Sequence, residues 1–249
     1  MSAAVAAEAS IRASALCRKF GARLALDQLD LQVTRGESVA LFGPNGAGKT
    51  TLVRILTLCL RASGGSFSIC GLDPRRDDLR IRRRIGLVSH ESFLYDDLTA
   101  AENLVFFARL YGVSDPAARA AVLLDAFGLA HRAADPLRAF SRGMRQRTSL
   151  ARALVHDPEL VFLDEPFSGL DPHAARTLQQ RLTQLRRDRR TILLVTHDLA
   201  SGLALSDRWI VLRQGRIAAE GRSAESDPLE FERWYHEQFA EAGRERRPA

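Results

Sequence analysis

Short, mostly apolar runs set the hydrophobic pattern of this chain. They occur at residues 38–42, 84–88, 160–163 and 192–196. Runs of this length are typical of strands in a parallel sheet that is buried on both faces. Residues 11–35 differ, because they alternate weakly between apolar and polar positions and contain turn-forming glycine, which predicts two or three antiparallel strands. The chain is therefore expected to contain both kinds of strand pairing.

Helical patterns lie between and after these strands. Residues 49–60 predict a helix directly after a glycine loop, and apolar residues at helical spacing between 104 and 111 predict a second one. Asp115–Pro116 indicates the start of a third, since proline suits the first turn of a helix. A hairpin is expected to turn at Gln214–Gly215, and residues 224–249 predict an exposed, charged helix with a frayed tail. This order of elements predicts an α/β domain.

Composition fits a globular protein, since 46% of the 249 residues are hydrophobic and 27% are charged. The longest apolar runs are strand-sized, so no membrane-spanning helix is expected. The N-terminal segment has neither a basic start nor a leucine-rich stretch, which argues against a secretory signal and for a cytoplasmic location. Cys17, Cys59 and Cys70 fall into no metal-ligand spacing, which favours reduced, buried thiols.

The net charge of +6 raises the question of an anionic partner. Almost all the basic residues are arginines, and no basic stripe interleaved with aromatic residues occurs, so we expect no nucleic-acid partner. Lys19 and Lys49 are the only lysines. In a chain that otherwise uses arginine, Lys49 indicates a position where a compact ammonium group is needed.

A glycine-rich loop lies between the predicted strand at 38–42 and the predicted helix at 49–60. It comprises Gly43, Pro44, Asn45, Gly46, Ala47, Gly48, Lys49 and Thr50, and it matches the pattern of a glycine, four residues and Gly-Lys-Thr. Such a loop turns backbone N–H groups and a helix N-terminus toward phosphate. Lys49 is expected to reach the β- and γ-phosphates of a nucleotide, and Thr50 to offer its hydroxyl to Mg²⁺. The alternative is an ordinary glycine turn before a helix.

Two acids follow the apolar run at 160–163. Asp164 and Glu165 are expected at the carboxyl end of a buried strand, where open α/β sheets bind their ligands. Neighbouring side chains on a strand point in opposite directions, so the two acids can hold different roles. Asp164 is our candidate for the Mg²⁺ site and Glu165 for polarising the attacking water. The alternative is a pair of acids that faces solvent.

His197 follows the run at 192–196 and is expected to face the same crevice. A histidine there can donate a hydrogen bond to the γ-phosphate, although a lone histidine at a strand end is more often structural.

A second helix start resembles an anion site. Ser141 is a good N-cap for a helix that begins within residues 140–147, and its free N–H groups would face an anion. Taken alone, this is a capped, basic helix. Because one γ-phosphate needs only one such cradle within a chain, the second cradle suggests that each chain supplies it to a partner.

These motifs, in this order, resemble the nucleotide-binding subunit of an ABC transporter. The resemblance implies a P-loop, RecA-like α/β fold over residues 11–222, with an antiparallel β subdomain and a helical subdomain near 91–157. A charged helix and tail would follow at 223–249. It also implies a head-to-tail dimer that holds two ATP molecules between one chain's phosphate loop and the other chain's signature residues.

The resemblance assigns roles to individual residues. Phe20 would stack on adenine, although it could equally be a core aromatic, and residues 43–51, which include Thr51, would form the Walker A motif. Residues 140–147 would be the ABC signature, with Ser141 and Gly143 as the γ-phosphate contacts. Asp171 would belong to the D-loop and would also cap a helix that starts at Pro172. His197 would be the H-loop histidine.

Three residues depart from the usual family pattern. Arg142 stands where glycine is usual and Met144 where glutamine is usual, and His90 replaces the Q-loop glutamine. Magnesium prefers oxygen ligands, so direct binding of Mg²⁺ by His90 is not expected. A histidine here, followed by the residues at 94–99 and by Glu102–Asn103, is similar to the ATPase of the haem exporter of cytochrome c maturation.

The sequence therefore predicts an ATPase that drives export and works with a separate integral-membrane permease. We expect it to be peripheral on the cytoplasmic face of the membrane and to dock through residues 90–115. The alternatives are an ATPase of another ABC-2-type drug or polysaccharide exporter, and a soluble ABC ATPase that acts on ribosomes or DNA. A catalytically inactive regulatory cassette is disfavoured, because Glu165 and His197 are both present.

Overall fold

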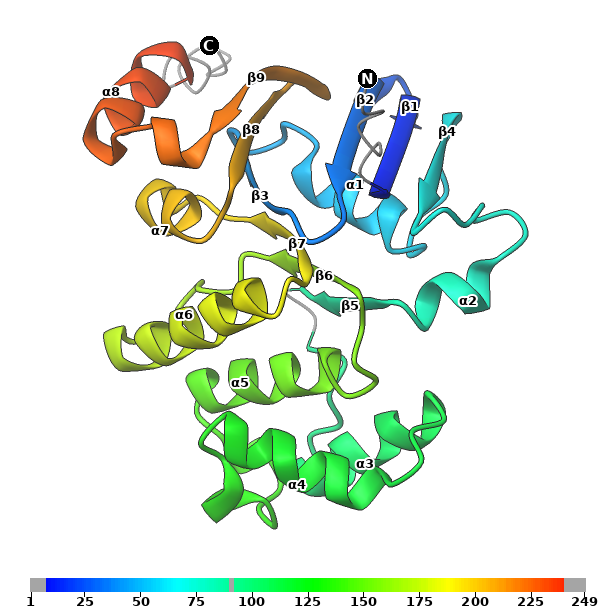
Figure 1. Cartoon of the computed structure of the whole chain (residues 1–249), viewed down its shortest axis with the longest axis vertical. Coiled ribbons are helices and arrows are strands. Elements are labelled where there is room, and N and C mark those ends of the chain that lie inside the picture. The colour runs from blue at the N-terminus through cyan, green and yellow to red at the C-terminus, as the bar shows by residue number, and fades with distance from the viewer. Residues whose placement is uncertain (1–7, 90–91, 240–249) are drawn as a thin grey trace, which may run out of the picture.

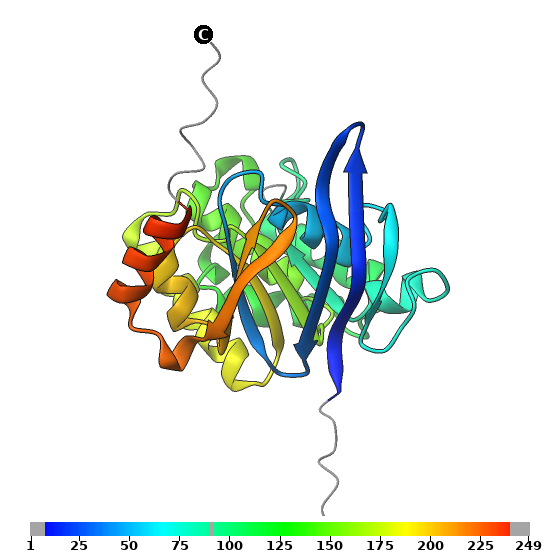
Figure 2. The same cartoon turned by 90° about the horizontal axis from the view of Figure 1, so that it is seen from above.

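The computed structural model describes residues 8–89 and 92–239, and these form two sheets with helices around them (Figure 1). The smaller sheet is antiparallel and has the strand order β2-β1-β4. Its strands are β1 (Ala9–Phe20), β2 (Arg23–Thr34) and β4 (Gly64–Ile69). The predicted antiparallel strands within 11–35 are confirmed as β1 and β2, which Figure 2 shows as a long hairpin beside the rest of the molecule.

The larger sheet has the order β5-β6-β7-β3-β8-β9. Its strands are β3 (Ser38–Phe42), β5 (Ile85–Val88), β6 (Leu160–Asp164), β7 (Thr191–Val195), β8 (Arg208–Arg213) and β9 (Arg216–Arg222). All neighbouring pairs are parallel except β8 and β9, which form the predicted hairpin around Gln214–Gly215. Every residue of β3, β6 and β7 is buried, as the continuous apolar runs predict.

Helices flank the larger sheet and form a separate helical part. The flanking helices are α1 (Lys49–Leu56), α2 (Asp78–Arg82), α6 (Pro172–Arg187) and α7 (Leu199–Ala204). The helical part contains α3 (Ala100–Leu110), α4 (Pro116–Ala126) and α5 (Arg142–Ala153) and lies at the bottom of Figure 1. Helix α1 ends before the predicted residue 60, because Leu58 adopts a left-handed backbone conformation with φ 61°.

Polar side chains start the helices of the helical part. Thr99 and Glu102 form a capping box at the N-terminus of α3. Asp115 caps α4 by accepting a hydrogen bond from the Ala118 N–H, with Pro116 in the first turn. The start of α4 confirms the prediction from Asp115–Pro116.

Helix α8 (Pro228–Phe239) corrects the prediction of an exposed C-terminal helix. Phe231 and Phe239 are buried in a cluster with Ala40 and Phe42 of β3 and with residues of α7. The helix carries one aromatic face and one charged face, and the aromatic face packs onto the domain. Residues 240–249, the predicted tail, lie outside the described residues.

The three cysteines are free thiols, as expected, but they are not buried in the core. Cys59 is exposed, and Cys17 and Cys70 are partly buried. Burial raises the pKa of the Cys70 thiol, and the nearby Glu159 carboxylate raises it further.

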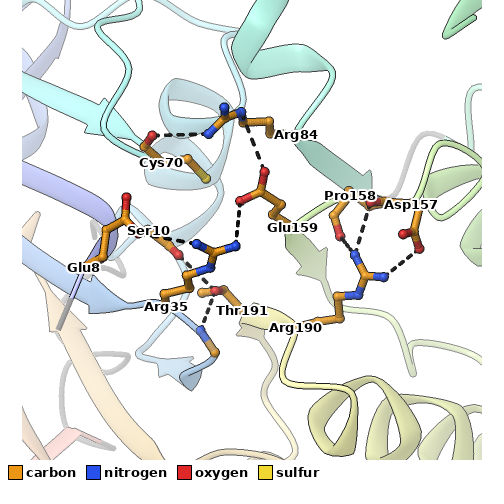
Figure 3. A network of polar contacts seen from close by, with 11 residues as sticks. Glu8, Ser10, Arg35, Cys70, Arg84, Asp157, Pro158, Glu159, Arg190 and Thr191 are labelled. Carbon is orange, nitrogen blue, oxygen red and sulfur yellow. Dashed lines mark hydrogen bonds and ion pairs between the residues drawn. The ribbon is translucent and has the colours of Figure 1, made fainter.

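A polar network ties together the amino ends of the parallel strands (Figure 3). Arg35, just before β3, pairs with Glu8 at 3.3 Å and with Glu159 at 3.6 Å, just before β6. Thr191 is the first residue of β7. Its hydroxyl forms a hydrogen bond with the Ser10 hydroxyl at 3.0 Å and accepts a hydrogen bond from the Gly36 N–H. This network fastens the antiparallel sheet to the larger sheet and leaves the carboxyl ends of the strands at the opposite edge.

Candidate functional site

The predicted phosphate loop and acids line one hollow at the carboxyl ends of the parallel strands. Its volume is about 360 Å³. It is lined by Phe20, Arg23, Ala25, Asn45, Gly46, Ala47, Gly48, Lys49, Thr50, Thr51, Asp164, Glu165 and Val195. The structure thus brings together residues that lie more than 100 positions apart in the sequence, at the edge where α/β sheets bind ligands.

Two glycines of the loop lie so close to the backbone of neighbouring segments that there is no room for a side chain. Gly43 has φ 142°, and a Cβ there would lie 2.3 Å from the Leu212 carbonyl oxygen. Gly48 has φ 109°, and a Cβ there would lie 2.5 Å from the Ala25 carbonyl oxygen. Gly48 is also the N-cap of α1 and uses no side chain to cap it. The first N–H groups of α1 therefore face the loop, in the arrangement that binds phosphate.

Lys49 crosses the loop at the first turn of α1. Its ammonium group donates to the carbonyl oxygens of Gly43 at 2.6 Å and Pro44 at 3.1 Å. Burial lowers the pKa of Lys49, while the carboxylates of Glu165 and Asp164 act in the opposite direction. The lysine is thus a cation held between the loop and two acids, where it can meet the charge of a terminal phosphate.

The two acids after β6 differ in environment, as predicted. Asp164 is the last residue of β6 and is 2% exposed. Glu165 leaves the strand with φ 54°, a left-handed conformation that is uncommon for a residue other than glycine. The Glu165 N–H donates to the Val195 carbonyl oxygen of β7, which holds the turn in place. The alternative of two acids that face solvent is therefore wrong.

His197 pairs with Glu165 across the ends of β7 and β6. Its Nδ1 lies 2.7 Å from Glu165 Oε2, and its backbone N–H points to the same oxygen. The imidazole is mostly exposed, with 75% of the side chain accessible, whereas Glu165 is 15% exposed. Asp198, the next residue, caps α7 and thereby fixes where the histidine leaves the strand.

Phe20 lies at the rim of the hollow and is 46% exposed, so the alternative of a core aromatic is wrong. The guanidinium of Arg18 lies 4.5 Å from the centre of its ring. Arg23 also lines the hollow and donates to the Gly46 carbonyl oxygen at 3.3 Å. Sequence reasoning missed Arg23, because it belongs to no motif and its position depends on the β1–β2 hairpin.

The residues predicted to form the signature lie at the start of α5. Ser141 is the N-cap, and its hydroxyl accepts from the Met144 N–H at 3.3 Å. A Cβ on Gly143 would lie 3.0 Å from Ala174 Cβ, so glycine permits the close approach of α5 and α6. Asp171 accepts from the Ala174 N–H and caps α6, as predicted. In the described part of the chain, residues 141–144 do not line the hollow that contains Lys49.

The unusual Arg142 touches Gly169, two residues before the predicted D-loop residue Asp171. Gly169 has φ 68°, and a Cβ there would lie 2.2 Å from Cζ of Arg142. The guanidinium therefore covers the face of Gly169 within the same chain. Gln146, one turn into α5, donates to the Pro166 carbonyl oxygen at 3.0 Å. Both contacts join α5 to the segment after β6, and neither could be read from a motif.

The predicted Q-loop position, His90, lies outside the described residues. Nearby, the buried Arg152 of α5 donates to the Leu87 carbonyl oxygen of β5. Its guanidinium lies 5.4 Å from the ring centres of both Phe93 and Phe107. Burial lowers the pKa of Arg152 to about 10, so the side chain is still charged near neutral pH. Arg152 thus fixes the chain on both sides of position 90.

Comparison with known proteins identifies this arrangement. Residues 26–168 match the family model described as ABC transporter. The chain belongs to the ABC transporter family. It is an ABC ATPase, and the predicted fold is confirmed by solved structures of ATP-binding cassettes.

Two of these structures are similar over most of their length. One is the ATP-binding subunit of an ABC transporter, with a TM-score of 0.79, 33% identity, and coverage of 85% of this chain and 89% of that one. The other is a dimeric post-hydrolysis state of an ATP-binding cassette bound to ADP and Pi. It has a TM-score of 0.79, 28% identity, and coverage of 86% of this chain and 98% of that one.

Relatives of this ABC ATPase include drug-resistance and export proteins. The daunorubicin resistance ATP-binding protein DrrA3 of Streptomyces coeruleorubidus is 40% identical over 88% of this chain and 70% of its own. The Nod factor export ATP-binding protein I of Burkholderia orbicola is 40% identical over 82% of this chain and 68% of its own. The doxorubicin resistance ATP-binding protein DrrA of Mycobacterium tuberculosis is 41% identical over 82% of this chain and 62% of its own. These names favour the alternative of a drug or polysaccharide exporter over haem export.

No helix in the described ranges, 8–89 and 92–239, is long and apolar enough to cross a membrane. The same ranges contain no cluster of three or more His, Cys, Asp or Glu side chains that could hold a metal ion.

Proposed function

We propose that this chain is the ATP-binding and ATP-hydrolysing subunit of an ABC-2-type exporter of drugs or polysaccharides. The observation that carries the proposal is the hollow in which Lys49 and its glycine loop face Asp164 and Glu165, with His197 bonded to Glu165. The exporter class follows from the relatives named for drug resistance and Nod factor export. The names of these relatives do not support the narrower resemblance to the haem exporter.

Thr50 and Asp164 fit a magnesium ion that enters with ATP. Both line the hollow and both offer oxygen, the ligand that Mg²⁺ prefers. Mg²⁺ usually takes only one or two protein ligands and completes its shell with phosphate and water, so a larger cluster of acids is not required. When bound, the ion would neutralise charge on the β- and γ-phosphates. Lys49 would contribute a second cation to the same phosphates.

Glu165 and His197 would carry the hydrolytic step. The Glu165 carboxylate would orient the attacking water and accept its proton as the water oxygen bonds to the γ-phosphorus and ADP leaves. In its imidazolium form His197 carries a proton on both ring nitrogens, so Nδ1 would donate to the Glu165 carboxylate and Nε2 of the exposed ring to the γ-phosphate. Phe20 at the rim would stack on adenine.

The signature residues would complete the site in a second copy of the chain. Ser141, Gly143 and the start of α5 offer N–H groups to an anion but do not line this chain's own hollow. A head-to-tail dimer would place them over the partner's ATP. One of the similar structures is described as dimeric and bound to ADP and Pi, which supports this arrangement.

A membrane permease would dock on an exposed aromatic patch of the helical part, on the cytoplasmic face. We define this patch as Phe93, Tyr95, Phe106 and Leu110, which are between 42% and 67% exposed. The rings of Tyr95 and Phe106 meet edge to face at 5.3 Å. Exposed aromatic groups of this kind mark interaction surfaces.

The loop that carries Tyr95 is fastened to the signature helix. Arg145 of α5 pairs with Asp96, and the Tyr95 N–H donates to the Asn103 side chain at 2.8 Å. A displacement of the aromatic patch would therefore act on α5, and this contact is a physical route from a docked permease to the signature residues.

Purification from detergent-solubilised membranes tests the proposal. A tagged chain is expected to retain an integral-membrane protein with several spans, and Phe106→Glu is expected to lose it. Val122→Glu on α4 is the matched control, since Val122 is also exposed but lies outside the patch. Retention of ribosomal or nucleic-acid partners in place of a membrane protein would overturn the proposal in favour of a soluble ABC ATPase.

A further inference from the structure

The turn of the β1–β2 hairpin, the top of the blue hairpin in Figure 2, brings two side chains to the rim of the nucleotide hollow. Phe20 and Arg23 are paired directly across the two strands, and both line the hollow. Residues that lie opposite each other in an antiparallel pair point to the same face. The hairpin therefore presents an aromatic ring and a guanidinium to the hollow together.

Arg23 also contacts the middle of the phosphate loop. Its Nη2 donates to the Gly46 carbonyl oxygen at 3.3 Å. Gly46 has φ 80°, and a Cβ there would lie 2.8 Å from the same nitrogen. The guanidinium thus lies directly against the loop, on the side from which Phe20 borders the hollow.

The charges of the hollow give Arg23 a distinct place. All its lining residues belong to the described ranges, and among them the basic residues are Lys49 and Arg23. Lys49 lies close to Asp164 and Glu165, and both carboxylates stabilise its charged form. Arg23 forms no ion pair with any of the described residues. The Gly46 carbonyl takes one of the several N–H donors of a guanidinium, so others are open to an anion.

The α-phosphate of a nucleotide is the anion that fits this place. In the proposed function the base stacks on Phe20 and the terminal phosphates meet Lys49, so the ribose and the α-phosphate must span the distance between them. Arg23 is bonded to Gly46, between these two residues in the lining of the hollow. A planar guanidinium binds phosphate with its charge and with parallel N–H groups, whereas ribose hydroxyls offer no charge to meet.

We propose that Arg23 binds the α-phosphate of the nucleotide, as a second cation beside Lys49. The inference rests on the proposed role of residues 43–51 in binding ATP. Hydrolysis breaks the bond between the β- and γ-phosphates and leaves the α-phosphate unchanged. Arg23 therefore contributes equally to the binding of substrate and transition state, and it acts on KM rather than on kcat.

Arg23→Gln tests this role, because it removes the charge and keeps an amide donor. We expect the Kd for MgATP and that for MgADP to rise by the same factor, about 3- to 30-fold. This range is below that of a buried charge-assisted bond, because Arg23 is exposed. The KM for ATP is expected to rise with kcat unchanged. Arg54→Gln is the matched control, since Arg54 is exposed on α1 and does not line the hollow.

Two further measurements distinguish a phosphate ligand from a residue that only supports the loop. Tripolyphosphate, which has neither base nor ribose, is expected to lose affinity for Arg23→Gln by the same factor as ATP. The ratio of the Kd values of Arg23→Gln and the unaltered chain is expected to fall as KCl rises from about 0.05 M to about 0.5 M, because salt screens an exposed charge. Arg23→Lys keeps the charge and is expected to recover part of the affinity.

The outcomes separate the two proposals. If the unaltered chain fails to bind MgATP, the proposed function is wrong. If it binds MgATP and Arg23→Gln binds it equally well, the inference is wrong. Weaker binding of ATP with unchanged binding of tripolyphosphate would place Arg23 on the nucleoside, and unchanged binding of ADP would place it on the γ-phosphate; both contradict the inference. A Kd ratio that does not change with salt, together with a lower Tm without nucleotide, would mean that Arg23 only supports Gly46.

Discussion

Nδ1 of His197 lies 2.7 Å from Oε2 of Glu165, so the residues at the ends of two neighbouring strands form one unit. Glu165 is mostly buried and in a left-handed backbone conformation, while the histidine extends into the open. This geometry suits a pair in which one member handles the water and the other meets the phosphate.

Replacement of Glu165 by Gln is expected to lower the rate of ATP hydrolysis by about 10²-fold or more, because the amide cannot accept the proton of the attacking water. ATP binding is expected to persist and to trap a dimer. Size exclusion with ATP, together with phosphate release, measures both effects. Glu159→Gln is the control, since Glu159 lies at the opposite end of β6. A purely monomeric Glu165→Gln protein in ATP would refute the dimer.

The two lysines offer a matched pair. Lys49→Met is expected to abolish measurable binding of MgATP, because it removes the cation held against the loop. Lys19→Met removes the same charge from an exposed position on β1 and is expected to leave binding unchanged. Titration calorimetry at millimolar ATP distinguishes them. Equal binding by both variants would show that this loop is not the phosphate site.

Phe20→Ala is expected to weaken ATP binding about 5- to 150-fold, the range for loss of one base-stacking contact. Binding of inorganic tripolyphosphate, which has no base, is expected to be unaffected. Phe20→Tyr keeps the ring and serves as the control. An equal loss of affinity for both ligands in Phe20→Ala would mean that Phe20 supports the loop rather than the base.

Stability is expected to depend on pH through His156. Burial lowers the pKa of His156 from 6.5 to about 4, and its Nε2 bonds the Ile85 carbonyl oxygen at 2.9 Å. The unfolded chain therefore binds a proton more readily than the folded one between these values, so this stabilisation is complete above pH 6.5 and is lost as the pH falls toward 4. The loss is on the order of 3 kcal/mol.

Urea unfolding between pH 4 and 7 measures this effect. His156→Gln keeps a donor for Ile85 and is expected to flatten the pH dependence over that interval. His131→Asn is the control, since His131 is exposed. A pH dependence that is the same in His156→Gln as in the unaltered chain would contradict the assignment.

Most of the larger sheet and the nucleotide site could be predicted from the sequence, because both are encoded locally. Continuous apolar runs mark β3, β6 and β7, and the glycine loop and acids follow two of them directly. By contrast, β4 and α2 were not predicted. β4 has two glycines and two serines among its six residues, and α2 has only five residues. The composition of β4 does not favour a strand, and β4 forms because it pairs with β1.

Contacts that depend on tertiary packing could not be predicted from the sequence. No motif assigns the contacts of Arg23, Arg142 and Arg152, and only the fold reveals what they touch. The aromatic face of α8 is different, because Phe231, Trp234, Tyr235 and Phe239 recur at helical spacing. That signal was present in the sequence, and the many charged residues around it led to the wrong prediction of an exposed helix.

The polar network at the amino ends of the strands is one of two places where the β1–β2 hairpin is fastened to the rest of the domain. Near its other end, the Asp27 N–H donates to the Gly215 carbonyl oxygen, Arg216 pairs with Asp27, and Arg23 donates to the Gly46 carbonyl oxygen. A hairpin anchored at both ends holds Phe20 at a set distance from the loop, so the width of the nucleotide pocket is built into the fold.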